Sequence, residues 1–169
     1  MAPRTPVLFF SGLIRFLDRM ACHHALDETG GGSAKKTPPS AWTEQLAEAE
    51  YRILFAEGTV PPGSSLLNHE TRQGTFICAA CFLPLFESRT KYTSGTGWPS
   101  FWQPIPDAIA TRTDWKLAMP RTEYHCANCG GHQGHVFDDG PQPTGMRYCN
   151  NGLALRFIPA GEALPPLRK

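Results

Sequence analysis

The stretch TFICAACFLPLFES, residues 75–88, places a Cys-x-x-Cys pair between two short apolar segments. A second stretch, EYHCANC at residues 123–129, repeats that spacing at the end of another apolar run. Two-residue spacing lets both thiolates of a pair turn toward one ion, and two pairs complete a tetrahedral shell. Four thiolates leave no open position for water, so we predict one structural zinc ion. Its four ligands are Cys78, Cys81, Cys126 and Cys129.

Short apolar segments separated by Gly and Pro surround the two pairs and predict a mainly β domain. In the last of them, LALRF, the apolar residues Leu153, Leu155 and Phe157 occupy alternate positions, as expected of a half-buried strand. The segments expected to be strands are 75–80, 84–88, 123–129, 134–137, 147–149 and 153–157.

One helix is expected ahead of the strands, in AWTEQLAEAEYRILFAE at residues 41–57. Four of its apolar residues follow helical spacing, with acidic residues on the opposite face. These four are Trp42, Leu46, Ala49 and Ile53. Gly58 is expected to end the helix, and a loop rich in Pro, Gly and Ser follows as far as Gly74.

The first forty residues are expected to be a weakly structured extension. Their apolar part, Val7–Leu17, is broken by Arg15 and lacks a clean cleavage site, which argues against a secretory signal. Gly30–Ser33 indicates a flexible linker. We expect a cytoplasmic protein, with organellar import or export by residues 1–40 as the alternatives. Import is considered because the first twenty residues carry three arginines and one acid. The predicted boundaries are 1–40 for the extension and linker, 41–160 for the domain and 161–169 for a loose tail.

Composition narrows the classes of partner. A formal net charge of +1 over 169 residues gives no electrostatic basis for binding nucleic acid or an anionic membrane. No stretch of the sequence approaches the ~18 apolar residues that a membrane helix needs. We therefore expect neither a nucleic-acid nor a membrane partner, and we expect a monomer.

Cys149, in RYCNNG, is a lone thiol outside the two pairs. It is either a small buried hydrophobe or a reactive group that a bend at Asn-Asn-Gly brings to the surface, and this segment alone leaves both open. Two other stretches favour a reactive site: GGHQGHVFDDGP supplies His132 and His135, and KYTSGTGWPSFWQP supplies loop aromatics that either cap a core or line a pocket. Taken alone, the two histidines would be interpreted as structural. With Arg147, these groups would make an activated-cysteine site. Cys22 lies in the extension and carries little functional expectation.

In this order, the motifs resemble the B-type methionine sulfoxide reductases, which reduce the R epimer. The match runs from about residue 41 to 158 through C-x-x-C, KY-x-SGTGWPSFW and C-x-x-C-GGH-x-GHVFDDGP-x-PTG-x-RYC-x-N. The resemblance implies two antiparallel sheets stapled by the four-cysteine zinc, with a short N-terminal helix. It also implies reduction of peptide-bound methionine-R-sulfoxide, a protein-repair reaction of oxidative stress, with thioredoxin or another thiol as reductant.

The functional residues of that family map onto this chain one by one. Cys149 matches the catalytic nucleophile, and its thiolate would attack the sulfoxide sulfur, release methionine and become a sulfenic acid. His132, His135 and Asn151 match the groups expected to polarise and protonate the sulfoxide oxygen. Three further positions match the substrate pocket: Trp98, Phe137 and Arg147. The two aromatic rings are expected to hold the substrate methyl group, and the guanidinium is expected to lower the pKa of the thiol.

Several positions depart from the family pattern. Many members carry a resolving cysteine where this chain has Thr96, so the sulfenic acid requires an external thiol, or Cys22. Gln133 and Asn150 stand where apolar residues are common, which would change the rim of the pocket. Val60 replaces a commonly acidic residue in GTVPPG, which affects an expected contact of this lead-in segment.

Two other classes of function are alternatives. A non-catalytic zinc-stapled module would bind peptides, but it would have no need for Cys149, His132 and His135 together. A dithiol oxidoreductase would use a Cys-x-x-Cys pair, and it predicts a reactive Cys78 without bound zinc. Two pairs in one small β domain, each next to a strand, favour zinc, so the reductase is the predicted function.

Overall fold

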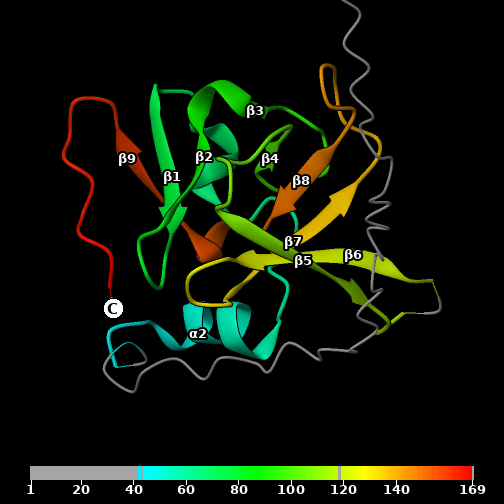
Figure 1. The fold of residues 1–169 in the computed structure, drawn as a ribbon, viewed down its shortest axis with the longest axis horizontal. Helices are drawn as coiled ribbons and strands as arrows, with labels where there is room; N and C mark the ends of the chain where they lie inside the picture. The colour runs from blue at the N-terminus through cyan, green and yellow to red at the C-terminus, as the bar shows by residue number, and fades with distance from the viewer. Residues whose placement is uncertain (1–41, 43, 118, 169) are drawn as a thin grey trace, which may run out of the picture. The chain divides into compact units, whose positions relative to one another are not determined.

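Two antiparallel sheets make up the described part of the protein (Figure 1). The computed structural model describes residues 42, 44–117 and 119–168, which lie within the compact unit Ala34–Lys169. The strands are β1 (Gly74–Cys78), β2 (Pro84–Glu87), β3 (Lys91–Tyr92), β4 (Ser100–Phe101), β5 (Ile109–Asp114), β6 (Arg121–Cys126), β7 (His132–Phe137), β8 (Arg147–Asn150) and β9 (Leu155–Pro159). The smaller sheet has the order β2-β1-β9 and the larger sheet β3-β4-β8-β7-β6-β5. The predicted mainly β fold is therefore confirmed.

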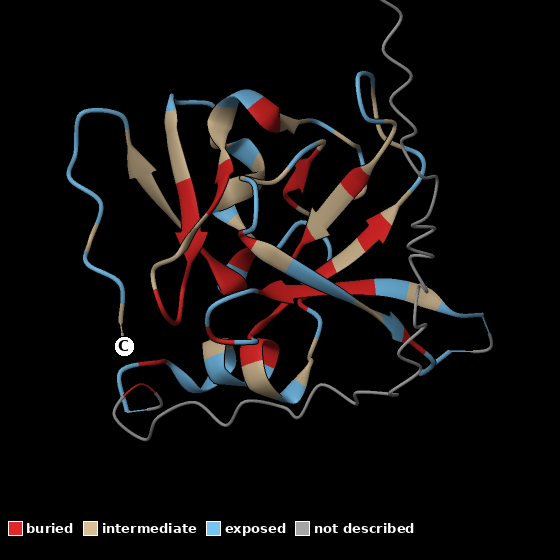
Figure 2. Cartoon of the chain, in the orientation of Figure 1, coloured by how far each residue is buried: buried red, intermediate tan, exposed pale blue. Residues whose placement is uncertain are grey.

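The hydrophobic core lies between the two sheets. Figure 2 shows buried stretches on strands of both sheets. Phe76 and Phe86 of the smaller sheet are fully buried against Phe101 and Tyr124 of the larger sheet. Phe86 stacks on Phe101 with ring centroids 4.2 Å apart, and Phe76 meets the same ring edge-on at 4.9 Å. Such aromatic pairs contribute about 0.5–1.5 kcal/mol each beyond the area they bury. The aromatic cluster thus fixes the smaller sheet against the sheet that carries β7 and β8.

A single helix with described ends, α2 (Glu48–Ala56), packs on β7 and on the 3₁₀ turn η3 (Gly152–Ala154). It begins at Glu48 because the Glu50 carboxylate accepts a hydrogen bond from the Ala47 N–H at 3.0 Å. It ends where Glu57 adopts a left-handed φ of 54°. Ile53 and Leu54 are its buried residues. The helix therefore packs its apolar face on β7, the strand that contains His132 and His135.

The predicted helix over 41–57 is interrupted, because Trp42 is helical but residues 44–47 are not. A turn that closes when the Gln45 N–H bonds the Trp42 carbonyl interrupts the helical spacing ahead of α2. Trp42 and Leu46 are buried as expected, but they precede α2. Ala49 lies within α2 and is exposed, so it does not belong to the buried face. Local turn geometry, which the apolar spacing does not report, sets the start of the helix.

Three strands lie outside the predicted segments. β3 and β4 have two residues each, and the last four residues of β5 are polar, so none of them shows an apolar run. The predicted strand at 153–157 is also wrong at its start. Leu153 lies in η3 and is 40% exposed, whereas Ala154 is fully buried. The turn changes which residues point to the core, so the expected alternation does not hold before β9 begins at Leu155.

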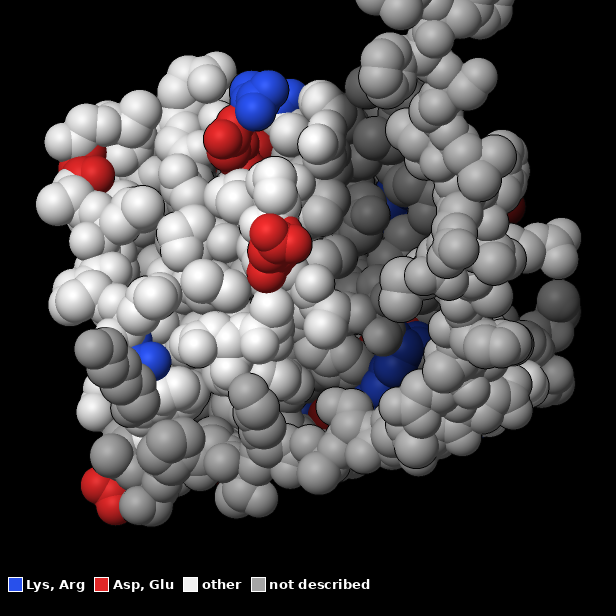
Figure 3. Space-filling model, viewed as in Figure 1, with Lys and Arg blue, Asp and Glu red and all other residues white. Residues whose placement is uncertain are grey.

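Arg168, near the C-terminus, makes two hydrogen bonds to the turn after β1, one of them from its backbone N–H to the Cys81 carbonyl at 3.0 Å. After β9 the described chain has no further helix or strand, but the Arg168 guanidinium donates to the Ala80 carbonyl at 3.0 Å. The predicted N-terminal extension, with Cys22 and the glycine linker, lies outside the described residues. None of the described helices is long and apolar enough to cross a membrane. On the face drawn in Figure 3, the described charged side chains are scattered rather than gathered into a basic patch.

Candidate active site

The four cysteines of the two Cys-x-x-Cys pairs converge in one buried cluster. Cys78 ends β1 and Cys126 ends β6, so the cluster joins the smaller sheet to the larger one. The sulfurs of Cys78 and Cys129 lie 3.7 Å apart, and those of Cys81 and Cys126 lie 3.4 Å apart. A tetrahedron with metal–sulfur bonds of about 2.3 Å places its sulfurs about 3.8 Å apart. The four side chains therefore fit a single metal ion.

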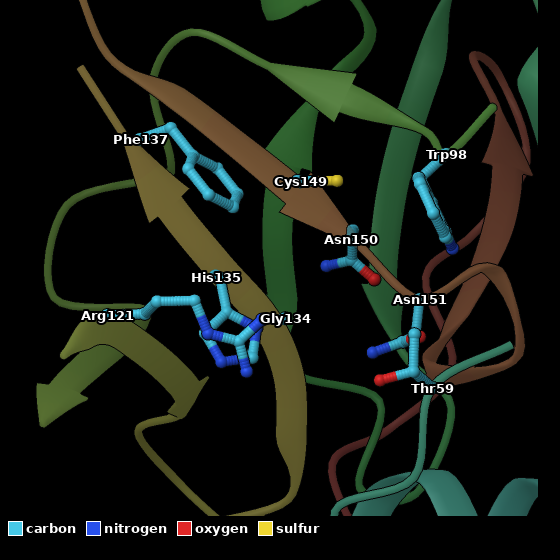
Figure 4. Close-up of a pocket in the computed structure, with 9 residues that line it drawn as sticks. All are labelled: Thr59, Trp98, Arg121, Gly134, His135, Phe137, Cys149, Asn150 and Asn151. Carbon is cyan, nitrogen blue, oxygen red and sulfur yellow. The ribbon is translucent and has the colours of Figure 1, made fainter. Parts of the chain in front are cut away.

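Cys149 lies in a small pocket on the larger sheet (Figure 4). It is directly opposite His135 in the pairing of β7 and β8. The rings of Trp98 and Phe137 lie on either side of it. The pocket has a volume of about 120 Å³, which suits one side chain rather than a drug-sized ligand, since such ligands occupy about 300 Å³ or more. The lining residues are Thr59, Trp98, Arg121, Gly134, His135, Phe137, Cys149, Asn150 and Asn151.

The Cys149 thiol is half-buried, and this burial raises its pKa. The Arg147 guanidinium and a hydrogen bond with the Thr96 side chain act in the opposite direction, because they favour the thiolate. Arg147 is itself paired with Asp139 through two hydrogen bonds of 2.7 and 2.8 Å. The expected effect of Arg147 on the pKa is thus present, but burial outweighs it. The free protein holds Cys149 mainly as a thiol at neutral pH.

His135 is held by a buried carboxylate at the end of β5. Its Nε2 lies 2.8 Å from Oδ2 of Asp114, and Arg121 donates to the same oxygen at 2.8 Å. A proton on Nε2 makes the first contact a hydrogen bond and leaves Nδ1 as an acceptor. Burial lowers the pKa of His135, although Asp114 opposes this shift. His135 is therefore neutral at pH 7, with Nδ1 able to accept a proton.

A chain of close polar contacts from β6 orients Asn151. Glu123 is 1% exposed, and its Oε1 lies 2.5 Å from Nδ1 of His132. Nε2 of His132 lies 3.2 Å from Nδ2 of Asn151. Nδ1 and Oε1 are close enough for an ion pair but are not aligned as a hydrogen bond. A proton on Nδ1 leaves Nε2 to accept from the Asn151 amide. His132 thus acts on the pocket through Asn151.

Glu123, His125 and His132 also form a second group whose ligand atoms lie within 4.8 Å of one another. The Arg112 guanidinium donates to the other oxygen of Glu123 at 2.9 Å. This cation already pairs the buried carboxylate and would repel a metal ion at the same place. We therefore assign the group to orienting Asn151 and not to binding a metal.

The lead-in segment ties Trp98 to Asn151. The indole Nε1–H of Trp98 donates to the Val60 carbonyl at 3.0 Å, and the Val60 N–H donates to Oδ1 of Asn151 at 3.1 Å. Both bonds use the backbone of Val60, whose side chain is buried. An apolar residue at this position therefore keeps these contacts. On the opposite rim, the Arg147 guanidinium lies 4.2 Å from the centroid of the Phe137 ring.

The structure places the predicted site residues in two groups. Those that line the pocket are Trp98, His135, Phe137, Cys149 and Asn151. His132 and Arg147 lie behind this lining and contact Asn151 and Phe137.

Four polar residues of the site were not predicted: Thr59, Asp114, Arg121 and Glu123. Arg121 and Glu123 occupy alternate positions of β6, so they share one face of the strand, and this spacing is a signal that could have identified them. Asp114 joins them only through the pairing of β5 with β6, where it is opposite Arg121.

A half-buried thiol opposite an imidazole, in a pocket with an aromatic rim, defines a site for nucleophilic cysteine chemistry. The SelR domain model matches residues 46–159. A peptide methionine sulfoxide reductase MsrB from Leptospira interrogans serogroup Icterohaemorrhagiae is 49% identical over 117 residues, which cover 69% of this chain and 89% of the relative. Proteins of the same name from Agrobacterium fabrum and Hahella chejuensis are 50% and 45% identical, over 70% and 76% of this chain and 88% and 94% of their own lengths. This chain belongs to the SelR domain family of MsrB proteins.

Proposed function

We propose that this protein reduces peptide-bound methionine-R-sulfoxide to methionine, with Cys149 as the nucleophile. The observation that carries the proposal is the place of the Cys149 thiol, half-buried opposite His135 and between the rings of Trp98 and Phe137 (Figure 4). Family membership supports the same reaction. A pocket of about 120 Å³ admits one side chain while the peptide backbone stays outside.

The protonation states of Cys149 and His135 supply the one proton that the first step needs. Because Cys149 is a thiol and His135 is neutral, the thiol carries the one proton that the sulfoxide oxygen needs. His135 accepts this proton at Nδ1 as the sulfur attacks, and then transfers it to the oxygen. Arg121 also lines the pocket. Its positive charge would stabilise the negative charge that develops on oxygen.

Asn151 has a supporting part in this scheme. Its Nδ2 donates to the Gln133 carbonyl at 3.2 Å and lies 3.2 Å from Nε2 of His132. Both amide hydrogens are thus engaged, and Oδ1 accepts from Val60. Asn151 therefore holds the lead-in segment and the wall of the pocket, while His135 moves the proton.

Oxygen passes from the methionine sulfur to Cys149, so the products are methionine and a Cys149 sulfenic acid. Two equivalents of an external thiol then return Cys149 to the thiol, with one disulfide and one water as products. The other described cysteines all belong to the metal cluster, and the side chain that hydrogen-bonds Cys149 from the GWPSF loop is Thr96. These observations support thioredoxin or a small thiol as the reductant.

We also propose that the metal in the four-cysteine cluster is zinc and that it is structural. Four buried thiolates at tetrahedral separations are the ligand set of a closed zinc site. Bound there, zinc would fix the turns after β1 and β6. Metal analysis of the purified protein checks this assignment, with one zinc per chain as the expected result.

A single-turnover assay tests the proposed reaction. Wild type and Cys149→Ser are offered the separate R and S epimers of a dabsylated methionine sulfoxide, first without and then with dithiothreitol. We expect reduction of the R epimer alone, one equivalent without reductant, and no reduction by the variant. A folded, metal-loaded wild type that turns over neither epimer would leave a non-catalytic peptide-binding module as the better account.

A further inference from the structure

Gln133 departs from the regular alternation of β7 because of a β-bulge. β6 and β7 pair Tyr124 with Gly134 and His125 with His132, so Gln133 is the extra residue between them. A bulge changes the direction in which its extra residue projects. The Gln133 side chain is fully buried and is not part of the pocket lining, whereas His135, two residues later, lines the pocket. The bulge thus directs an amide into the protein interior between the two histidines.

The Gln133 amide links the cysteine cluster to Asn150. Its Nε2 donates to Sγ of Cys78 at 3.6 Å, and its Oε1 accepts from Nδ2 of Asn150 at 3.4 Å. The same Asn150 amide donates to the Tyr124 hydroxyl at 2.9 Å. All four residues are 0% exposed. None of these groups can replace a lost partner with bulk water, so each depends on the others.

The backbone of Gln133 extends the same connection to Asn151. Its carbonyl accepts from the Asn151 N–H at 2.7 Å and from Nδ2 of Asn151 at 3.2 Å. Asn150 and Asn151 directly follow Cys149 and line the pocket with it (Figure 4). One residue therefore contacts the cysteine cluster on one side and both residues after the nucleophile on the other.

We propose that Gln133 is a positioning residue that couples the four-cysteine metal cluster to Cys149. This inference rests on the proposed function, because it takes Cys149 as the reactive group. A metal-bound thiolate is a charged acceptor, and hydrogen bonds to charged groups are about twice as strong as neutral ones. The amide held at Cys78 then holds Asn150 and the end of β8. Coupling between two sites is reciprocal, so Asn150, which reaches the cluster through Gln133, also affects retention of the metal.

Zinc release from the full-length, zinc-loaded protein tests the coupling. The chelator 4-(2-pyridylazo)resorcinol reports the release rate by its absorbance. We expect Gln133→Leu and Asn150→Val each to speed release by at least about twofold. This factor corresponds to the smallest interaction energies found between residues of one hydrogen-bond network. The double variant is expected to release zinc no faster than Gln133→Leu alone, because both changes break one connection. Gln103→Leu makes the same chemical change at an exposed position and is expected to match wild type.

Alkylation of Cys149 by iodoacetamide, followed by mass spectrometry of its peptide, gives a second readout. In zinc-loaded Gln133→Leu we expect alkylation at least about twofold faster, because the end of β8 loses its anchor. This readout needs no turnover, so it separates failure of the coupling from failure of the reductase proposal, which the Cys149→Ser assay decides.

Wild-type zinc release in Asn150→Val together with wild-type alkylation in Gln133→Leu would overturn the coupling, whatever the loss of thermal stability. If Gln133→Leu does not fold, zinc release and alkylation in Asn150→Val decide the question alone.

Discussion

The replacement Asp114→Asn tests how His135 is prepared for proton transfer. Oδ1 of Asp114 accepts from the Lys116 N–H at 3.0 Å, and Oδ2 lies 2.8 Å from His135 Nε2 and accepts from Arg121 at 2.8 Å. Asparagine keeps the shape of the side chain, but it has only one acceptor oxygen. With that oxygen on Lys116, the amide hydrogens face both donors. His135 must then give up its Nε2 proton and carry it on Nδ1, where the thiol proton is to be accepted.

The expected size of this effect follows from the contacts. General acid–base catalysis contributes about 10²–10⁴-fold, so we expect kcat to fall by a factor in that range. Hydrogen bonds to charged partners contribute about 1.5–3 kcal/mol, and Asp114 is 5% exposed, so we expect a loss of that order in the free energy of unfolding. The Lys116 N–H, His135 and Arg121 hold the pKa of Asp114 below its ordinary value of 3.8. The stability from its charge is therefore present above pH 3.8 and is lost as pH falls through the lower, folded pKa.

The measurement is single-turnover reduction of the dabsylated R epimer by wild type, Asp114→Asn and Asp138→Asn. Asp138 is exposed, so its replacement controls for loss of one negative charge near the site. Thermal denaturation confirms that each variant is folded at the assay temperature. A folded Asp114→Asn protein with kcat within about twofold of wild type would refute the assigned tautomer and the role of His135, since the acid–base contribution is far larger.

Four further outcomes are expected. Thr96→Cys places a second thiol beside Cys149, so one turnover without reductant should consume two free thiols by disulfide formation, as thiol titration shows; a persistent sulfenic acid would contradict this. Arg147→Met removes the cation that favours the thiolate, so the pKa of Cys149 should rise further and the pH midpoint of alkylation should move upward; an unchanged midpoint would count against the contact. Because burial lowers the pKa of His135, the unfolded chain binds more protons and stability should rise with pH up to about 6.5 and slightly beyond. Urea denaturation at low and neutral pH should show a smaller rise for His135→Gln, and equal rises would exclude this linkage. Chelation of the metal should lower the melting temperature, with recovery on adding zinc; an unchanged melting temperature would show that the cluster does not hold the sheets together.

Much of the fold could be predicted because its signals are local. The two cysteine pairs identify the metal cluster, since two-residue spacing alone brings both sulfurs of a pair to one side. Apolar runs predict β1, β2, β6 and β7, which are long enough to show periodicity. β3 and β4 have no such run, and they form because β8 offers β4 a partner and β4 offers one to β3. The start of α2 and the turn before β9 depend on individual hydrogen bonds, so apolar spacing gave the wrong limits there.

The sequence by itself determined the chemical groups of this protein: four metal-ligating cysteines, a separate Cys149, and histidines on the strand that follows the second pair. Only the tertiary structure decided what those groups face. The pairing of β5 with β6 brings Asp114 to His135, and the bulge in β7 turns Gln133 away from the pocket and toward Cys78. Both outcomes depend on strand register, which is set by core packing and by the bulge. A shift of one residue reverses the face of every following side chain, so the pattern of residue types along the chain cannot specify these partners.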